Sequence, residues 1–224
     1  MADECCAGAR LATLLEKPAK ESVEFELFET MLLEDGEIFL LERHVERLKK
    51  SAAYFGFRFE FPADLAVSGK WKVKVRLQRN GNFTVERSPI TNSTSLMRVA
   101  LAAAPINSSD RFLFHKTTRR SFKLRPDCDD VIFWNERGEI TESSIANVVV
   151  VIDDELCTPP ISSGLLAGTF RDQLLAEGKI RERVITIAEL KDAAGLFLIN
   201  SVRKWMKAEL VVEQDLGASA AKLL

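Results

Sequence analysis

The chain has 224 residues, of which 46% are hydrophobic and 29% charged, and its formal net charge at pH 7 is -2. This length is enough for one large domain or two modest ones with a buried core, and the near-neutral charge gives no general attraction to nucleic acids or acidic membranes. No apolar run approaches the roughly 20 residues of a membrane-spanning helix, and the chain begins with acidic residues where a signal peptide is basic, so we expect a cytoplasmic protein that binds neither nucleic acid nor membrane.

The first 20 residues are rich in small side chains and are expected to form a flexible amino-terminal tail. This tail contains two of the four cysteines, Cys5 and Cys6. The cysteines lack the paired spacing of a zinc site, and the chain has only two histidines to add as ligands. We therefore expect no metal site.

Residues 21–105 are expected to form a small α/β lobe that begins with a hairpin. Two apolar strands, 23–33 and 38–41, flank Asp35 and Gly36, a pair of residues typical of a tight turn between strands.

A helix is predicted after this hairpin, because apolar residues recur at steps of three and four over residues 44–55. Gly56 can end the helix in a left-handed conformation. Alternating polar and apolar residues predict further strands at residues 71–78, 83–87 and 97–105.

Turn-forming residues at 105–110 are the predicted linker to a larger carboxy-terminal lobe, residues 106–224. In this lobe short apolar runs alternate with turns and two helical segments. The predicted strands are 131–134, 139–143, 147–152, 182–187 and 196–200, and the predicted helices are 169–178 and 188–193. No internal repeat is present, so we expect a mixed α/β fold rather than a solenoid.

Lys116 directly follows an apolar run, FLFH, that would bury its stem. Burial lowers the pKa of a lysine, and a neutral amine can form a Schiff base with an aldehyde cofactor or act as a base. The alternative for any single lysine is a solvated surface charge.

Glu142 lies in a stretch that otherwise has the composition of a buried strand. A buried carboxylate needs a partner. The partner is either a local cation such as an arginine or a ligand group that becomes more basic when paired, such as a pyridine nitrogen.

The stretch SGLLAGTFRDQLL opens a helix through small residues, so the free N–H groups of its first turn could bind a phosphate. Arg47 could add a guanidinium group to the same phosphate. An unliganded turn and an exposed helix charge are the alternatives for these two features.

Five segments together resemble, in order, the signature blocks of class IV aminotransferases. The resemblance covers roughly residues 23–208, and its blocks are ETMLLEDGEIFLLERHVERLKKSA, HKTTRR, FWNERGEITESSIANVVVV, TPPISSGLLAGTFR and LINSVRKW. Within the family, HKTTRR, NERGEITES and NSVR are most similar to aminodeoxychorismate lyases, especially those fused to a synthase component.

This resemblance implies a two-lobed fold type IV enzyme, like D-amino-acid aminotransferase, with pyridoxal 5'-phosphate in the cleft between the lobes. It implies that Lys116 forms the Schiff base, that Glu142 faces the pyridine nitrogen and that Arg47 binds the phosphate. Further implied cofactor contacts come from Thr169, Phe170, Ser201 and Val202.

The resemblance also implies lyase chemistry, in which pyruvate is eliminated and 4-aminobenzoate is formed in the folate pathway. Thr30 supports this, because lyases are similar to this chain in placing a threonine hydroxyl beside the cofactor, whereas aminotransferases carry glycine or an aliphatic residue there. Lys116 and Thr30 are therefore the candidate catalytic residues. The chain departs from the lyases in having Lys123 where a tyrosine is expected.

The implied substrate is a dianion, so arginines near the cleft should bind its carboxylates. Of the candidates Arg76, Arg120 and Arg203, we assign this contact to Arg76 and Arg203. Solvent-facing charges are the alternative for each of them.

Two other functions share the same cofactor residues. One is an aminotransferase for branched-chain or D-amino acids, and the other is a non-catalytic appendage of a synthase complex. The resemblance further implies a homodimer, a small-molecule substrate and an aminodeoxychorismate synthase component as a candidate partner.

Overall fold

The computed structural model describes residues 24–62, 65, 67–90, 96–120 and 127–211. The expected tail at residues 1–20, with Cys5 and Cys6, lies outside these residues, and so does Lys123. In the described part of the chain, no helix is long and apolar enough to cross a membrane.

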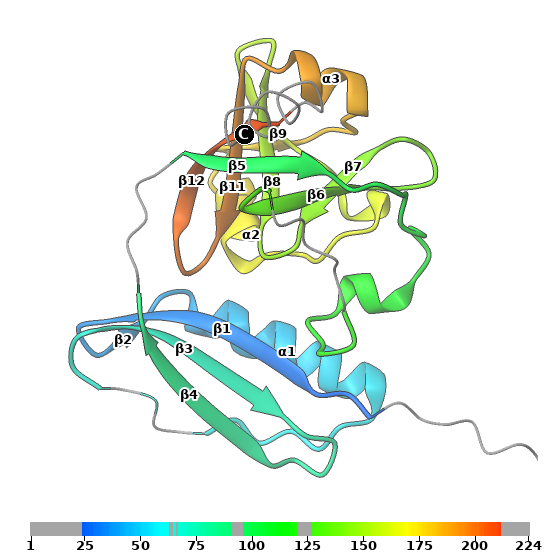
Figure 1. The fold of residues 1–224 in the computed structure, drawn as a ribbon. Coiled ribbons are helices and arrows are strands. Elements are labelled where there is room, and N and C mark those ends of the chain that lie inside the picture. Colours follow the sequence, from blue (N-terminus) through cyan, green and yellow to red (C-terminus); the bar gives the residue numbers. More distant parts are fainter. Residues whose placement is uncertain (1–23, 63–64, 66, 91–95, 121–126, 212–224) are drawn as a thin grey trace, which may run out of the picture.

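The amino-terminal lobe is a four-stranded antiparallel sheet with one helix packed against it (Figure 1). Its strands have the order β2-β1-β3-β4, with bounds β1 (Leu27–Glu34), β2 (Glu37–Ile38), β3 (Lys70–Leu77) and β4 (Phe83–Pro89). The predicted turn between β1 and β2 is present, with positive φ at Asp35 (52°) and Gly36 (85°).

Helix α1 (Leu41–Phe55) covers the buried face of this sheet. β1 alternates so that Leu27, Met31 and Leu33 contact the apolar stripe of the helix. The helix ends at Gly56, as predicted, where a φ of 71° lets the backbone N–H donate to Ala52 O.

The carboxy-terminal lobe is an eight-stranded sheet in which β7 also pairs with β8, so that six strands close into a ring. The strand order is β10-β9-β8-β11-β12-β5-β6-β7. The strands are β5 (Met97–Leu101), β6 (Asp130–Trp134), β7 (Ile140–Ser143), β8 (Asn147–Ile152), β9 (Glu155–Thr158), β10 (Arg181–Glu182), β11 (Gly195–Asn200) and β12 (Lys204–Leu210). The helical segments are η1 (Arg111–Phe114), η2 (Ile161–Ser163), α2 (Thr169–Ala176) and α3 (Ile187–Asp192).

The valine run of β8 is buried on both faces, which explains its continuous apolar sequence. Val148 and Val150 join the main core of the ring, whereas Val149 packs with Phe170 and Leu174 of α2. The helix α2 is thereby fixed against the outside of the sheet.

Strand β5 bears on the position of the lobe boundary. The sequence places residues 97–105 in the amino-terminal lobe, but β5 pairs in parallel with β12 and β6 of the eight-stranded sheet. We therefore propose that the boundary lies between Pro89 and Met97 rather than at residue 105. The predicted mixed α/β fold with two lobes is confirmed.

Candidate active site

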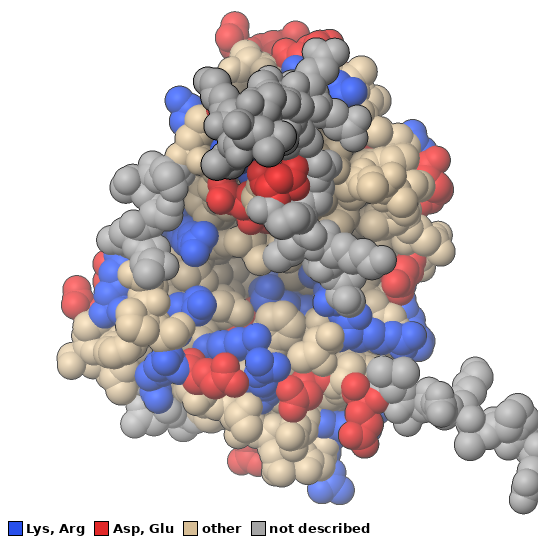
Figure 2. Space-filling view, viewed as in Figure 1, with Lys and Arg blue, Asp and Glu red and all other residues tan. Residues whose placement is uncertain are grey.

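A cavity of about 380 Å³ lies between the two lobes. β1, α1 and β3 line it from one side, and β7, β8, the start of α2 and the turn between β11 and β12 line it from the other. Small-molecule sites typically measure roughly 300–1,000 Å³. Figure 2 shows a hollow between the two parts of the molecule, with Lys and Arg side chains along its lower edge. The cavity therefore suits a small anionic ligand.

Lys116 lines this cavity from the segment that follows η1. Its backbone is fixed to the edge of β1, because the Phe28 N–H donates to Lys116 O at 3.0 Å. Its Nζ lies 4.9 Å from the centre of the Phe28 ring. Burial, together with the charge of Arg47, lowers the pKa of Lys116 to about 8. A larger fraction of this amine is thus uncharged near neutral pH than for an exposed lysine, which favours nucleophilic or base chemistry.

Glu142 lines the same cavity from β7 and is buried. Its Oε1 accepts a hydrogen bond from the Leu166 N–H at 3.2 Å and forms an ion pair with Arg120. Burial raises the pKa of Glu142, against the opposing charge of Arg120. Of the two kinds of partner that the sequence left open, the structure shows a local arginine.

Arg47 is held by a carboxylate that the sequence analysis did not single out. Its Nε and Nη2 donate to the two oxygens of Glu29, at 2.8 and 2.6 Å, and its Nη1 donates to Ala167 O at 2.8 Å. Burial alone would raise the pKa of Glu29, but Arg47 and His44 outweigh it and bring this pKa to about 2. Arg47 therefore joins β1 to the residues just before α2.

His44 extends this network to the start of α2. Its Nδ1 lies 2.7 Å from Glu29 Oε2, and its Nε2 lies 3.2 Å from Thr169 Oγ1. Burial lowers the pKa of His44. A neutral ring that donates from Nδ1 to Glu29 can accept from the Thr169 hydroxyl at Nε2. A signal for Glu29 exists in the sequence, since it is the one charged residue on the inward face of a strand with Leu27 and Met31.

The start of α2 meets the cavity through Gly168 and Thr169. A Cβ on Gly168 would lie 1.9 Å from Asn147 Oδ1, so no side chain fits at this position. Asn147 is itself fixed, because its Nδ2 donates to Leu166 O at 2.9 Å. Gly168 therefore lines the cavity with its backbone alone. The first N–H groups of a helix have no partner within the helix.

Two predicted cofactor contacts, Phe170 and Val202, have side-chain or backbone groups that are already engaged elsewhere in the protein. The Phe170 side chain packs away from the cavity, against Phe39 and Trp205, so only its backbone in the first turn of α2 remains as a candidate contact. Ser201 and Val202 both line the cavity, but the Val202 N–H donates to Asn200 Oδ1 at 3.0 Å.

The predicted substrate arginines separate in the structure. Arg203 lines the cavity, whereas Arg76 is absent from its lining and pairs with Glu26 and Glu86. Two lysines that the sequence analysis did not select, Lys72 and Lys74, line the cavity from the same strand as Arg76. The alternation KWKVKVRL signals this basic face, although it does not say which positions reach the cavity. On the neighbouring strand β1, Thr30 also lines the cavity.

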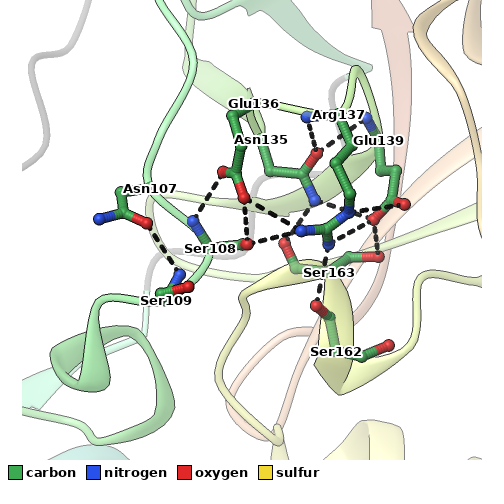
Figure 3. Close-up of polar contacts among 9 residues, drawn as sticks. All are labelled: Asn107, Ser108, Ser109, Asn135, Glu136, Arg137, Glu139, Ser162 and Ser163. Carbon is green, nitrogen blue, oxygen red and sulfur yellow. Dashed lines mark hydrogen bonds and ion pairs between the residues drawn. The ribbon is translucent and has the colours of Figure 1, made fainter.

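A polar cluster centred on Arg137 ties together the loops that lead to the cavity residues (Figure 3). Arg137 donates to Ser108 Oγ at 2.7 Å, to Glu139 Oε2 at 2.8 Å and to Ser162 O at 3.0 Å. Asn135 adds a hydrogen bond from Nδ2 to Ser163 O at 2.9 Å. These loops precede the segments of Lys116, Glu142 and Thr169, respectively.

The chain is similar in sequence and in structure to known proteins. The sequence profile described as "Amino-transferase class IV" matches residues 26–69 and 77–211. The crystal structure of a Mesorhizobium loti protein described as a "Putative amino-acid aminotransferase" superposes with a TM-score of 0.75 at 33% identity, covering 84% of this chain and 100% of that one.

Two yeast proteins are similar in sequence. A Schizosaccharomyces pombe protein named "Putative aminodeoxychorismate lyase" is 29% identical over 223 residues, which cover 89% of this chain and 95% of that protein. The Saccharomyces cerevisiae "Aminodeoxychorismate lyase" is 29% identical over 144 residues, covering 53% of this chain and 38% of that protein.

Proposed function

The chain belongs to the class IV aminotransferase family, and we propose that it is a pyridoxal 5'-phosphate enzyme with 4-amino-4-deoxychorismate lyase activity. In this reaction pyruvate leaves the substrate and the remaining ring becomes 4-aminobenzoate. The observation that carries the proposal is that one cavity is lined by a lysine of lowered pKa, a buried carboxylate and a helix start with an adjacent guanidinium group. The two yeast relatives support the choice of a lyase.

The residues of the cavity fit three groups of the cofactor, namely its aldehyde, its ring nitrogen and its phosphate. Lys116 offers an amine to an aldehyde, and Glu142 offers a carboxylate to a ring nitrogen. Arg47 and the first turn of α2 offer donors to a phosphate, beside Gly168, whose missing side chain makes room for the Asn147 amide group. Lys116 and Glu142 are near enough for each charge to change the pKa of the other.

When bound, pyridoxal phosphate withdraws electrons from the substrate carbon that carries the amino group. The uncharged Nζ of Lys116 is the base that takes the proton from this carbon. Thr30 lines the cavity beside Phe28, and we assign its hydroxyl to the departing pyruvate, whose oxygen it protonates or whose carboxylate it holds.

Positive charge in the cavity suits a substrate with two carboxylates. We propose that Lys72, Lys74 and Arg203 bind these carboxylates, because all three line the cavity. The ion pairs of Arg76 with Glu26 and Glu86 make it a weaker candidate for this contact.

The test measures pyruvate and 4-aminobenzoate after the purified protein is mixed with pyridoxal phosphate and aminodeoxychorismate, without any keto acid. We expect equal amounts of the two products, because elimination needs no acceptor. Lys116→Ala should abolish both, whereas Lys191→Ala, at an exposed lysine on α3, should not. Absence of both products from the wild-type protein would exclude the lyase.

An aminotransferase for branched-chain or D-amino acids is the second candidate, favoured by the 33% identity with the Mesorhizobium loti chain. It would share the cofactor residues and differ in returning the proton to the cofactor. Activity on a branched-chain or D-amino acid that depends strictly on an added keto-acid acceptor would select this function. The resemblance of the sequence also supports a homodimer, and an aminodeoxychorismate synthase component as the source of the substrate.

A further inference from the structure

Arg120 forms an ion pair with Glu142 inside the cavity, four residues after Lys116. Both side chains are nearly removed from solvent, with exposed fractions of 9% for Arg120 and 6% for Glu142. A buried ion pair has to offset the desolvation of both charges, so two charges persist in such a place only with close mutual contact. The pair is therefore a buried ion pair of the cavity wall rather than a solvated surface contact.

The contacts of Glu142 that we find among the described residues fall on one of its oxygens. Oε1 receives both the Arg120 guanidinium group and the Leu166 N–H. Because the two donors approach from different segments, they fix the plane of the carboxylate. This arrangement offers the other oxygen, Oε2, to a ligand in the cavity.

The charges around this pair come from several of the segments that line the cavity. Lys116 is near enough to act on Glu142, and Arg120 in turn is one of the charges that lower the pKa of Lys116. Further cations line the cavity from α1, β3 and the β11–β12 turn, namely Arg47, Lys72, Lys74 and Arg203. Arg120 is the one that contacts Glu142 directly.

We propose that Arg120 is a positioning residue of this site, whose guanidinium group keeps Glu142 as a carboxylate in a fixed orientation toward the bound ligand. The proposal rests on the proposed function in so far as the ligand is pyridoxal phosphate. A carboxylate can attract a protonated ring nitrogen, whereas a protonated carboxyl group cannot. Arg120 thus acts through Glu142 and does not itself need to touch the reacting atoms.

The first test follows the protonation of Glu142 without any cofactor. Protein labelled with ¹³C at the glutamate carboxyl carbons is titrated by NMR, and Glu142→Gln identifies the signal. In Arg120→Gln the titration midpoint of Glu142 should rise by about one to three pH units, because a neighbouring arginine lowers a carboxyl pKa by that amount. Arg120→Lys, which keeps the charge, should have a Glu142 midpoint between those of Arg120→Gln and the wild type.

The matched control is Arg183→Gln, which removes an arginine from an ion pair with Asp153 and Glu189 away from the cavity lining. This change should leave the Glu142 midpoint where it is. An unchanged midpoint in Arg120→Gln, in protein with the circular dichroism of the wild type, overturns the proposal. If Arg120→Gln does not fold, the same decision rests on Arg120→Lys, whose Glu142 midpoint should lie above that of the wild type, and an unchanged midpoint in this variant overturns the proposal.

The second test adds pyridoxal phosphate and follows its visible absorbance as a function of pH. In Arg120→Gln the cofactor should bind more weakly, and the pH at which its absorbance changes should move, with Arg120→Lys between the variant and the wild type. Identical titration curves in all three proteins contradict the proposal. Failure of the wild-type protein to bind pyridoxal phosphate would instead reject the proposed function, while the NMR titration still decides the role of Arg120.

Discussion

Glu29 places a negative charge at a fully buried position on β1, where it meets Arg47 and His44. These partners lower its pKa from 4.5 to about 2, despite the burial that raises it. A carboxyl group whose pKa is lower in the folded state stabilises the protein above its unfolded pKa. The contribution of Glu29 is therefore complete above about pH 4.5 and is lost as the pH falls toward 2.

We predict that Glu29→Gln lowers the free energy of unfolding at pH 7 by roughly 3 kcal/mol, because a shift of one pKa unit corresponds to about 1.4 kcal/mol and the buried Arg47 guanidinium group loses its carboxylate. Urea unfolding at pH 7 and at pH 3 measures the effect, and the difference between variant and wild type should shrink at pH 3. Glu34→Gln is the control, since Glu34 pairs with Lys70 on the surface. Equal losses of unfolding free energy in the two variants would contradict the assignment of this stability to the buried contacts of Glu29.

Residues of the site could be predicted only where the sequence immediately around them has a recognisable pattern. Lys116, Glu142 and Arg47 lie in segments with a recognisable pattern, and all three line one cavity. Glu29 was not found because its partners come from α1, which the alternation of β1 does not reveal. Likewise, Arg76 and Lys74 have the same place in the pattern of β3, and only the packing of the second lobe decides which one faces the cavity.

Among the elements, the hairpin β1–β2 and the helix α1 were predicted because a turn and an apolar stripe depend on neighbouring residues. The assignment of β5 depends instead on parallel pairing with β12 and β6, which lie about 30 to 110 residues away along the chain. Pairing over such distances leaves no mark in a single strand. Many of the elements were therefore predictable, but β9 and β12 were not among the predicted strands, and the distribution of strands between the two sheets was not predicted either.

The loops between the elements are held by Arg137, which makes hydrogen bonds to three segments at once (Figure 3). We predict that Arg137→Ala loosens the segments of Lys116 and Thr169 together and increases hydrogen exchange at the backbone N–H groups of residues 108–117 and 163–170. Mass spectrometry of peptic peptides measures this exchange. Arg181→Ala, which removes a surface ion pair with Glu155, should leave both segments unchanged. Faster exchange at residues 135–139 alone would show that the cluster only orders its own turn.

At the scale of the whole molecule, polar contacts join the two lobes at the cavity, and apolar packing such as that of Phe39 against Phe170 adds to them. Arg47 donates to Ala167 O, Thr169 lies within hydrogen-bond distance of His44, and the Ser201 hydroxyl donates to the backbone of Thr30 at 3.3 Å. A ligand phosphate bound at the start of α2 would contact both sides of this seam. Ligand binding and the stability of the whole chain should therefore be linked.

We predict that pyridoxal phosphate, at 100 times its dissociation constant, stabilises the folded protein by about 2.7 kcal/mol. A chain of this size gains about 2–4 °C in Tm for each kcal/mol, so the expected rise is about 5–10 °C. Differential scanning calorimetry measures it. Pyridoxal, which lacks the phosphate, should give a much smaller rise in Tm at the same concentration, because it makes no contact with Arg47 or the first turn of α2. Equal rises with both compounds would show that the phosphate does not join the two lobes.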